Sequence, residues 1–234
     1  MQISGLQKTT LLDFPGHVAA TVFLQGCNFC CPFCHNKDLV LGSPKAFCTE
    51  EELLIFLKKR QGILDGVCIT GGEPTLHKEL FSLIDNIKNL GYLVKLDTNA
   101  SNPAVLKALH ERHMLDYAAI DIKTCKERYK MVCGWDDAKE SKLLPLIEES
   151  VSWLLEGHIP YEFRTTVVKE LHRMEDFLPI GEWIGGCSSY YLQSYKDSDS
   201  VISPGFSSYT KDELTDICRL LKPYIPHVEI RGID

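Results

Sequence analysis

Short β-rich runs alternate with helical patterns along this chain of 234 residues. The runs are rich in Val, Ile, Tyr, Phe and other residues that favour strands, and helical segments of about 10–15 residues separate them. This alternation predicts repeated βα units and a mostly parallel sheet. The six predicted strands cover residues 19–24, 67–70, 92–97, 117–122, 161–168 and 190–195.

The length of the chain restricts how these units can close. A full eight-fold barrel needs about 250 residues, which is slightly more than this chain has. We therefore expect an open, six-stranded partial barrel. A flat, doubly wound sheet is the alternative, and the pattern alone does not separate the two.

Local signals predict where the helices begin. Thr49 followed by Glu52 forms a capping box that opens a helix through about residue 59. Asn102 before Pro103 is predicted to cap another helix. Helices are predicted over 78–89, 102–113, 142–157, 175–184 and 211–221, with an irregular segment at 125–137, a polar loop at 196–209 and a last strand at 227–231.

The composition predicts one globular domain over residues 1–234. A hydrophobic content of 44% supports a sizeable core, and 24% charged residues exclude a disordered chain. The longest uncharged apolar stretch, near residues 18–24, is much too short to span a membrane, and no secretory signal is evident. The net charge of −7, without any Lys/Arg run, argues against nucleic acid as the main partner.

Cysteine usage is unusual in this chain. Four of the ten cysteines fall within eight residues, at Cys27, Cys30, Cys31 and Cys34. Without an export signal, we expect a cytoplasmic location in which thiols are free or bound to metal. Soft thiolates select iron–sulfur clusters, zinc or copper(I). The other six cysteines are scattered and are interpreted as core or surface thiols.

The spacing of Cys27, Cys31 and Cys34 favours an iron–sulfur cluster over a zinc site. Structural zinc needs four closed ligands, usually as two separated pairs, and no second close pair follows in the sequence. Cys30 adjoins Cys31, and the side chains of adjacent residues diverge in extended or turn backbone. A [4Fe–4S] cluster with three cysteine ligands leaves one iron open, as a catalytic cluster requires. Zinc and an unligated loop remain the alternatives.

Polar and special residues follow the predicted strands. In parallel α/β folds the chemistry takes place at the carboxyl ends of strands. The cysteine loop follows the first predicted strand, and residues 71–74 (GGEP), 97–99 (DTN) and 121–123 (DIK) follow the next three. Arg164 lies within the fifth strand and Gln193 within the sixth. These elements are therefore expected to converge on one rim.

Two motifs resemble those of a known family. The segment CNFCCPFCHN at residues 27–36 looks like the signature loop of the radical S-adenosylmethionine enzymes, including the aromatic Phe33 before the third cysteine. The run ITGGEP at residues 69–74, after the next strand, strengthens this resemblance.

Further motifs narrow the resemblance to the glycyl-radical-enzyme activases. These are TLLDFPG at residues 10–16 and DIK at 121–123. The runs RTTV at 164–167 and YLQ at 191–193 are closer to the activating proteins of anaerobic ribonucleotide reductase than to those of pyruvate formate-lyase. The resemblance covers nearly the whole chain, from about residue 3 to 195.

The resemblance implies a fold, two cofactors and a partner. The fold would be a partial (β/α)6 TIM-like barrel with a core of about residues 15–195 and a C-terminal extension at 196–234. The cofactors would be one [4Fe–4S] cluster and S-adenosylmethionine, which is cleaved to a 5′-deoxyadenosyl radical. This radical would remove a hydrogen atom from a glycine of a partner enzyme, and a flavodoxin or ferredoxin would supply the electron.

The resemblance also assigns site residues. The cluster and its catalytic role fall to Cys27, Cys31 and Cys34. The residues expected to contact S-adenosylmethionine are Phe33, Asn36, Gly71, Gly72, Glu73, Thr98, Asn99, Asp121, Lys123 and Arg164. Lys123, a compact point charge, suits the methionyl carboxylate, and Asp121 suits a ribose hydroxyl. The family often has Gly after the Thr-Asn pair, whereas this chain has Ala100.

Each motif also has a purely structural interpretation. The GGEP run could be an ordinary turn. Asp121 and Lys123, two residues apart on one strand, could form only an ion pair, and Arg164 could pair with Glu162 for the same reason. His172 is interpreted as a solvated loop histidine that could nevertheless reach the site.

Three functions from different classes remain open at this stage. The first is an activase that acts on a glycyl radical enzyme, with anaerobic ribonucleotide reductase preferred over pyruvate formate-lyase. The second is a radical enzyme that acts on a small molecule. The third is a non-catalytic cluster-binding or zinc-binding module, in which the residues at 71–74 and 121–123 would have no purpose.

Overall fold

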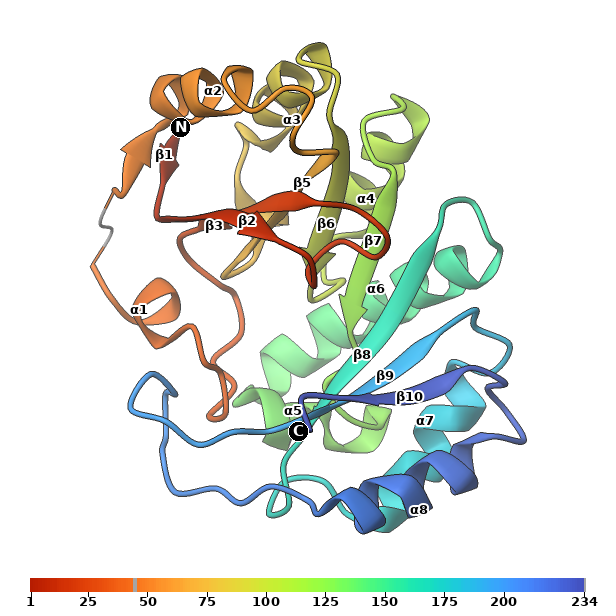
Figure 1. Cartoon of the computed structure of the whole chain (residues 1–234). Helices are drawn as coiled ribbons and strands as arrows, with labels where there is room; N and C mark the ends of the chain where they lie inside the picture. Colours follow the sequence, from red (N-terminus) through yellow and green to blue (C-terminus); the bar gives the residue numbers. More distant parts are fainter. Residues whose placement is uncertain (44–45, 234) are drawn as a thin grey trace. The chain divides into compact units, whose positions relative to one another are not determined.

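The computed structural model describes residues 1–43 and 46–233 of the chain (Figure 1). The chain is organised as two compact units. The first unit comprises Met1–Asn28, Asp38–Thr98 and Asn102–Ala118, and the second comprises Phe29–Lys37, Asn99–Ser101 and the chain from Ala119 onward. Each unit contains βα repeats of its own.

The first unit is built on a mostly parallel sheet. Strands β3 (Ala19–Leu24), β5 (Gly66–Gly71) and β6 (Leu93–Thr98) pair in parallel, and β2 (Gly5–Thr10) is an antiparallel edge next to β3. The start of β7 (Tyr117–Asp121) completes this unit's sheet beside β6. The other elements of this unit are the short antiparallel pair β1 (Gln2–Ile3) and β4 (Cys48–Thr49), α2 (Glu50–Lys58), η1 (Pro74–Leu76), α3 (Leu80–Asn89) and α4 (Pro103–Glu111).

The two faces of this sheet differ in chemistry, because successive side chains of a strand point to opposite faces. One face is buried and apolar up to Thr98 at the end of β6; its apolar residues are Ala20, Val22, Leu24, Val67, Ile69, Val94 and Leu96. The other face carries Thr21, Cys68 and Lys95, which lie opposite one another across β3, β5 and β6. Within the body of the sheet, a charged side chain thus lies on only one of these two faces, at Lys95.

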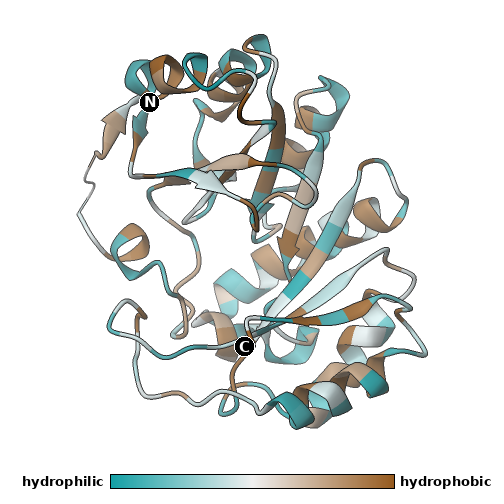
Figure 2. Ribbon diagram, in the orientation of Figure 1, coloured by the Kyte–Doolittle hydropathy of each residue, from teal (hydrophilic) through white to brown (hydrophobic). Residues whose placement is uncertain are grey.

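The second unit repeats the parallel arrangement. Here β8 (Tyr161–Val167), β9 (Tyr190–Ser194) and β10 (Val228–Arg231) pair in parallel, with the end of β7 beside β8. Helix α8 (Lys211–Leu221) alternates hydrophilic and hydrophobic residues (Figure 2). Its buried residues are Leu214, Ile217, Cys218 and Leu221. The other elements here are η2 (Lys126–Arg128), α5 (Tyr129–Cys133), α6 (Asp137–Leu155), η3 (Met174–Asp176), α7 (Phe177–Trp183) and α8 (Lys211–Leu221), and α1 (Lys37–Val40) lies where the chain passes back to the first unit.

Most element predictions are confirmed, and the exceptions have physical reasons. The six predicted strands are present, and the capping box of Thr49 and Glu52 forms. The prediction of an irregular segment at 125–137 is wrong, because this segment contains the helical turns η2 and α5. Helix α6 also begins five residues earlier than predicted, because the Asp136 side chain caps it. The side chain of Asn102 does not cap α4; it donates to the carbonyl of Thr75 instead (3.1 Å).

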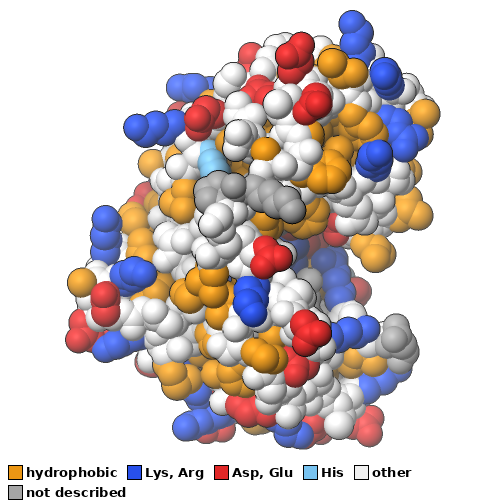
Figure 3. All heavy atoms as spheres, turned by 90° about the vertical axis from the view of Figure 1, so that its left-hand side faces the viewer, with side chains coloured by type: hydrophobic (Ala, Val, Ile, Leu, Met, Phe, Trp, Pro, Cys, Tyr) orange, Lys and Arg blue, Asp and Glu red, His pale blue; other side chains and the backbone are white. Residues whose placement is uncertain are grey.

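The surface mixes charged and apolar side chains. On the face shown in Figure 3, basic and acidic groups are interspersed among apolar ones. Within the described residues, no helix combines the length and the apolar character that crossing a membrane would require.

Ala100 has a backbone conformation that favours glycine. Its φ is +64°, and its carbonyl accepts a hydrogen bond from the buried Ser150 hydroxyl (2.7 Å). A left-handed conformation costs an L-residue about 1–2 kcal/mol, so this backbone is strained where the family often has glycine. The hydrogen bond to Ser150 helps to hold it.

We expect Ala100→Gly to leave stability unchanged or to raise it by up to about 1 kcal/mol, because relief of strain offsets the greater flexibility of unfolded glycine. The matched control is Ala104→Gly on the exposed side of α4, which should lower stability by about 1 kcal/mol. Urea denaturation of both variants measures the difference. Equal losses at the two positions would contradict the strain at Ala100.

Candidate active site

The chain that leads into Cys27 is packed tightly against the residues that follow β5. The backbone N–H of Gly72 donates to Leu24 O (2.9 Å), and that of Glu73 donates to Gly26 O (2.7 Å). A Cβ atom at Gly72 would lie 1.9 Å from Gly26 O, so only glycine fits there. Gly71 has a φ of +124°, and a Cβ atom there would lie 2.3 Å from Leu24 O. The two glycines therefore allow the segment after β5 to pack closely against the backbone of Leu24 and Gly26.

Glu73 joins this segment to the end of β6. Its buried Oε1 atom accepts hydrogen bonds from the Thr75 backbone N–H (3.0 Å), the Thr75 hydroxyl (2.5 Å) and the Thr98 hydroxyl (2.6 Å). Thr98 and Glu73, both predicted site residues, thus lie in direct contact. This geometry favours the prediction that Glu73 orients the segment after β5.

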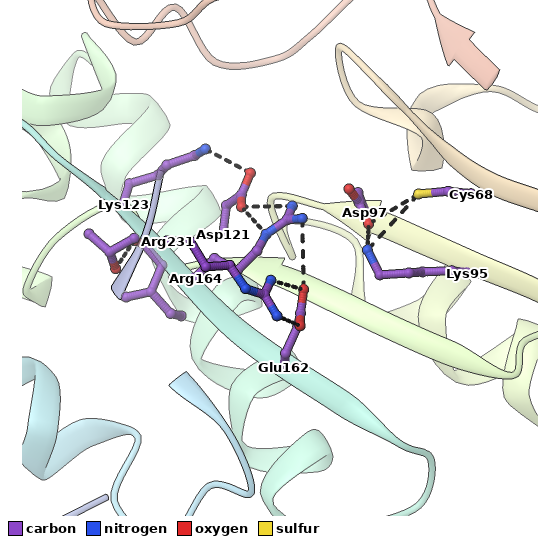
Figure 4. Close-up of polar contacts among 10 residues, drawn as sticks. Cys68, Lys95, Asp97, Asp121, Lys123, Glu162, Arg164 and Arg231 are labelled. Atoms are coloured by element: carbon purple, nitrogen blue, oxygen red, sulfur yellow. Dashed lines mark hydrogen bonds and ion pairs between the residues drawn. The ribbon is translucent and has the colours of Figure 1, made fainter. Parts of the chain in front are cut away.

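A buried lysine lies on the polar face of the first unit's sheet. Lys95 is only 1% exposed, and its ammonium group forms an ion pair with Asp97 and lies 4.0 Å from Cys68 Sγ (Figure 4). Cys68 Sγ lies 3.5 Å from Asp97 Oδ1. Lys95 was not among the predicted site residues, and Cys68 is buried as expected of a core thiol. A charged residue two positions before Asp97, within an apolar strand, was the available signal.

The rest of the cysteine loop belongs to the second unit. Cys31 is buried, Cys34 is half-buried and Cys30 is exposed, so the adjacent Cys30 and Cys31 differ in their access to solvent. The Cys34 N–H donates to Cys31 O (3.0 Å), which makes a tight turn. Residues after β9 hold this turn, since Ile202 N donates to Cys34 O (3.1 Å) and Ser203 N to Pro32 O (2.8 Å).

The two thiols of this turn have different electrostatic surroundings. A hydrogen bond with the Cys133 thiol lowers the pKa of Cys31 despite its burial, and the positive charge of Lys123 also lowers it. Burial raises the pKa of Cys34. Cys31 is therefore the thiol of this pair that its surroundings favour as a thiolate, the form that binds metal.

Asp121 connects two cations at the end of β7. Its Oδ2 accepts a hydrogen bond from Lys123 Nζ (3.0 Å), and its Oδ1 accepts from Arg164 Nε (3.0 Å) and Nη2 (2.9 Å) (Figure 4). Burial opposes the charges, but the two cations hold the pKa of Asp121 well below its usual range. Asp121 in turn raises the pKa of Lys123 above its usual range. All three groups are therefore charged at neutral pH.

The ion pair of Asp121 and Lys123 is thus present, whereas Arg164 binds Asp121 more closely than Glu162, the partner in its purely structural interpretation. Arg164 Nη1 lies 3.9 Å from Glu162 Oε1, farther than its contacts with Asp121. Glu162 is held mainly by Arg231 on β10. The side chains of Asp121 and Lys123 remain partly exposed, at 30% and 19%, so their pairing leaves them accessible to a ligand.

The backbone of Lys123 is held on both sides by residues that the sequence did not single out for this role. Its N–H donates to the Tyr129 hydroxyl (3.0 Å), and its carbonyl accepts from His172 Nε2 (2.7 Å). His172 Nδ1 lies 3.0 Å from the Val168 nitrogen and 3.2 Å from the Val168 carbonyl oxygen; the first contact matches a neutral ring with its proton on Nε2. The prediction that His172 is a solvated loop residue is wrong, because it is fully buried.

The remaining predicted residues have local contacts in the second unit. Phe33 is buried, with its ring 6.0 Å from that of His172. Asn99 Oδ1 accepts from Ser101 N (3.0 Å), and Asn36 is half-buried. Among the described residues, no group of three or more His, Cys, Asp or Glu side chains is arranged to hold a metal ion.

Comparison with known proteins places these motifs in a family. Residues 21–150 match the model of the Radical SAM superfamily. The chain is 31% identical over 239 aligned positions to a Methanocaldococcus jannaschii protein provisionally named a glycyl-radical enzyme activating enzyme, covering 99% of this chain and 96% of that protein. It is also 31% identical over 150 positions to a Thermococcus kodakarensis protein provisionally named GTP 3′,8-cyclase, covering 63% of this chain and 47% of that protein.

A solved structure shows the same fold. The crystal structure of Streptococcus suis SuiB bound to S-adenosylmethionine has a TM-score of 0.67 at 13% identity, covering 91% of this chain and 52% of that one. The expected fold class, a partial (β/α)6 TIM-like barrel with mostly parallel strands, is confirmed. The chain spans about half the length of SuiB and of the T. kodakarensis relative.

The buried, neutral His172 should make stability depend on pH. Burial lowers its pKa from 6.5 in the folded protein, so below that pH the unfolded chain binds a proton that the folded protein does not. The free energy of unfolding should be highest above pH 6.5 and should fall as the pH drops toward the folded pKa. In His172→Gln, an amide that does not titrate can still donate to Lys123 O and accept from Val168 N.

We therefore expect His172→Gln to lose less stability than the wild type between about pH 7.5 and about pH 5.5. Denaturant unfolding at a series of pH values measures this difference. The same decrease in both proteins would show that His172 does not titrate as its burial requires.

Proposed function

We propose a function for this chain on the premise that it belongs to the Radical SAM superfamily, whose model matches residues 21–150. Members of this family use a [4Fe–4S] cluster and S-adenosylmethionine. When bound, these cofactors supply the electron and the 5′-deoxyadenosyl radical of the reaction. We assign the chain as a glycyl-radical-enzyme activase, which forms a radical on a backbone glycine of a partner enzyme.

Cys27, Cys31 and Cys34 would hold the cluster. Three thiols on one short loop match the preference of Fe–S centres for cysteine. Two of these cysteines share one tight turn, in which the Cys34 N–H donates to Cys31 O (3.0 Å). Cys30, which is exposed, is not assigned as a ligand. The chemistry of this donor set, three cysteine thiols within one short motif, is what such a cluster requires.

Lys123 and Asp121 are the residues that would hold S-adenosylmethionine through charge. The partly exposed ammonium of Lys123 suits the methionyl carboxylate, and Asp121 would accept from a ribose hydroxyl. Arg164 keeps Asp121 ionised and oriented. The other residues proposed to contact or orient the cofactor are Phe33, Asn36, Gly71, Gly72, Glu73, Thr98 and Asn99.

The assignment as an activase rests on the length over which this chain is similar to the M. jannaschii protein. The M. jannaschii relative matches across 99% of this chain and 96% of its own length. A radical enzyme that acts on a small molecule is the second candidate, supported by the 150-position match to the protein provisionally named GTP 3′,8-cyclase. The motifs at 164–167 and 191–193 favour anaerobic ribonucleotide reductase as the partner over pyruvate formate-lyase. A flavodoxin or ferredoxin would donate the electron.

The activity can be tested with the anaerobically reconstituted protein. With dithionite and S-adenosylmethionine it should form 5′-deoxyadenosine. Addition of an anaerobic ribonucleotide reductase from the same organism should give a glycyl radical by electron paramagnetic resonance, and a pyruvate formate-lyase should give less. Cleavage of S-adenosylmethionine with no radical on either protein would favour the small-molecule candidate.

Cysteine variants test the cluster ligands. Ala at Cys27, Cys31 or Cys34 should each abolish the visible absorbance of the iron–sulfur centre and the bound sulfide, because a three-thiolate site has no spare ligand. Cys30→Ala is the matched control from the same loop and should retain both. Loss of the cluster in Cys30→Ala, or its retention in Cys31→Ala, would contradict this assignment.

Lys123→Ala should weaken the binding of S-adenosylmethionine while iron content stays unchanged. A hydrogen bond to a charged group contributes about 1.5–3 kcal/mol, so affinity should fall roughly tenfold to a hundredfold. Lys169→Ala, which removes an exposed lysine paired with Glu213, is the control. Calorimetric titration of both variants measures the effect, and unchanged affinity in Lys123→Ala would remove this residue from the site.

A further inference from the structure

Arg231 on β10 forms an ion pair with the buried carboxylate of Glu162. Its Nη1 and Nη2 atoms donate to Glu162 Oε1 (3.1 Å) and Oε2 (3.0 Å), in the two-pronged geometry that makes such pairs strong. The guanidinium group also lies 3.2 Å from the ring centroid of Tyr191. Glu162 is 1% exposed, whereas Arg231 is 33% exposed. Arg231 thus compensates a charge that water cannot reach.

Glu162 and Arg231 are the outer end of an alternating row of charges. Arg164 Nη1 lies 3.9 Å from Glu162, Arg164 binds Asp121 through Nε and Nη2, and Asp121 binds Lys123. Figure 4 shows this row as positive, negative, positive, negative and positive from Arg231 to Lys123. Every link lies within the second unit. The row therefore connects β10 to the residue proposed to bind the methionyl carboxylate.

We propose that Arg231 is a positioning residue for S-adenosylmethionine, an inference that rests on the proposed roles of Asp121 and Lys123. A buried carboxylate without a partner of opposite charge is strongly unfavourable, so we expect it to form an ion pair with another cation nearby. Arg164 lies on the same face of β8, two residues from Glu162. Without Arg231, Glu162 would draw the Arg164 guanidinium away from Asp121.

The loss of Arg164 from Asp121 would also affect Lys123, because Lys123 and Arg164 both pair with the Asp121 carboxylate. When Arg164 leaves Asp121, the negative charge of Asp121 is neutralised by Lys123 alone. The Lys123 ammonium is then held more tightly by Asp121 and is less available to a cofactor carboxylate. Arg231 would thereby keep Lys123 available without touching the cofactor.

The strand that carries Arg231 lies outside the part of the chain that the family model matches. That match ends at residue 150, and β10 was not among the six strands of the expected barrel. In the sheet, Arg231 lies opposite Gln193 of β9, which places it beside the end of that strand. The last strand would thus contribute to cofactor binding as well as to the sheet.

The test compares the S-adenosylmethionine affinity of two variants of the cluster-loaded protein. One loses only the charge of Arg231, and the other loses the charges of both Arg231 and Glu162. Arg231→Gln should weaken S-adenosylmethionine binding about tenfold. The double variant Arg231→Gln/Glu162→Gln should recover nearly wild-type affinity, because Glu162 no longer competes for Arg164. Arg231→Lys keeps the charge but not the two-pronged contact, and should fall between. Arg219→Gln removes an exposed arginine of α8 and is the control.

Affinity is measured by calorimetric titration under anaerobic conditions, well below the melting temperature of each variant, with iron content and thermal melts recorded in parallel. A purely structural role would lower the melting temperature of Arg231→Gln without changing the affinity. If Arg231→Gln does not fold, the comparison of Arg231→Lys with wild type carries the test.

The outcomes separate this inference from the proposed function. If the wild type does not bind S-adenosylmethionine, the proposed function itself is wrong. If the wild type binds and Arg231→Gln, or Arg231→Lys where only that variant folds, binds equally well, the role of Arg231 is refuted. If the double variant binds as poorly as Arg231→Gln, the loss comes from packing of β10, and the charge competition is refuted.

Discussion

Side-chain alternation along parallel strands is the constraint on which both units depend. In the first unit it gives β3, β5 and β6 one face that is apolar up to Thr98 and one face that carries Thr21, Cys68 and Lys95. In the second it places Glu162 and Arg164 on one face of β8, while Phe163 and Thr165 occupy the other. Charges within a sheet are costly unless they are paired, and each of these charged side chains has a partner of opposite sign.

Backbone contacts then fix the loops that carry the motifs. The glycines after β5 allow the chain to approach Gly26 O more closely than any side chain would permit. Tyr129 and His172 hold the two sides of the Lys123 backbone, and residues after β9 hold the turn of Cys31 and Cys34. A site that binds a charged cofactor benefits from such support, because its groups are then oriented before the ligand arrives.

Ion pairing and ligand binding are compatible at Asp121. Its contacts with Lys123 and Arg164 keep all three groups ionised, yet its side chain and that of Lys123 stay partly exposed. The ion pair of the structural interpretation is therefore present, and the proposed binding of S-adenosylmethionine would use the charges that this pair maintains. The pairing of Glu162 with Arg231 keeps Arg164 available for this role.

The sequence by itself determined the features that depend on near neighbours along the chain. The βα alternation, the capping box at Thr49 and the motif of Cys27, Cys31 and Cys34 could be identified because each is encoded within a few residues. Only the tertiary structure decided that His172 is buried, that Arg164 binds Asp121 more closely than Glu162, and that Arg231 holds Glu162 from 69 residues away. Burial and long-range ion pairs depend on which segments the fold brings together, and no local pattern of residues specifies those contacts.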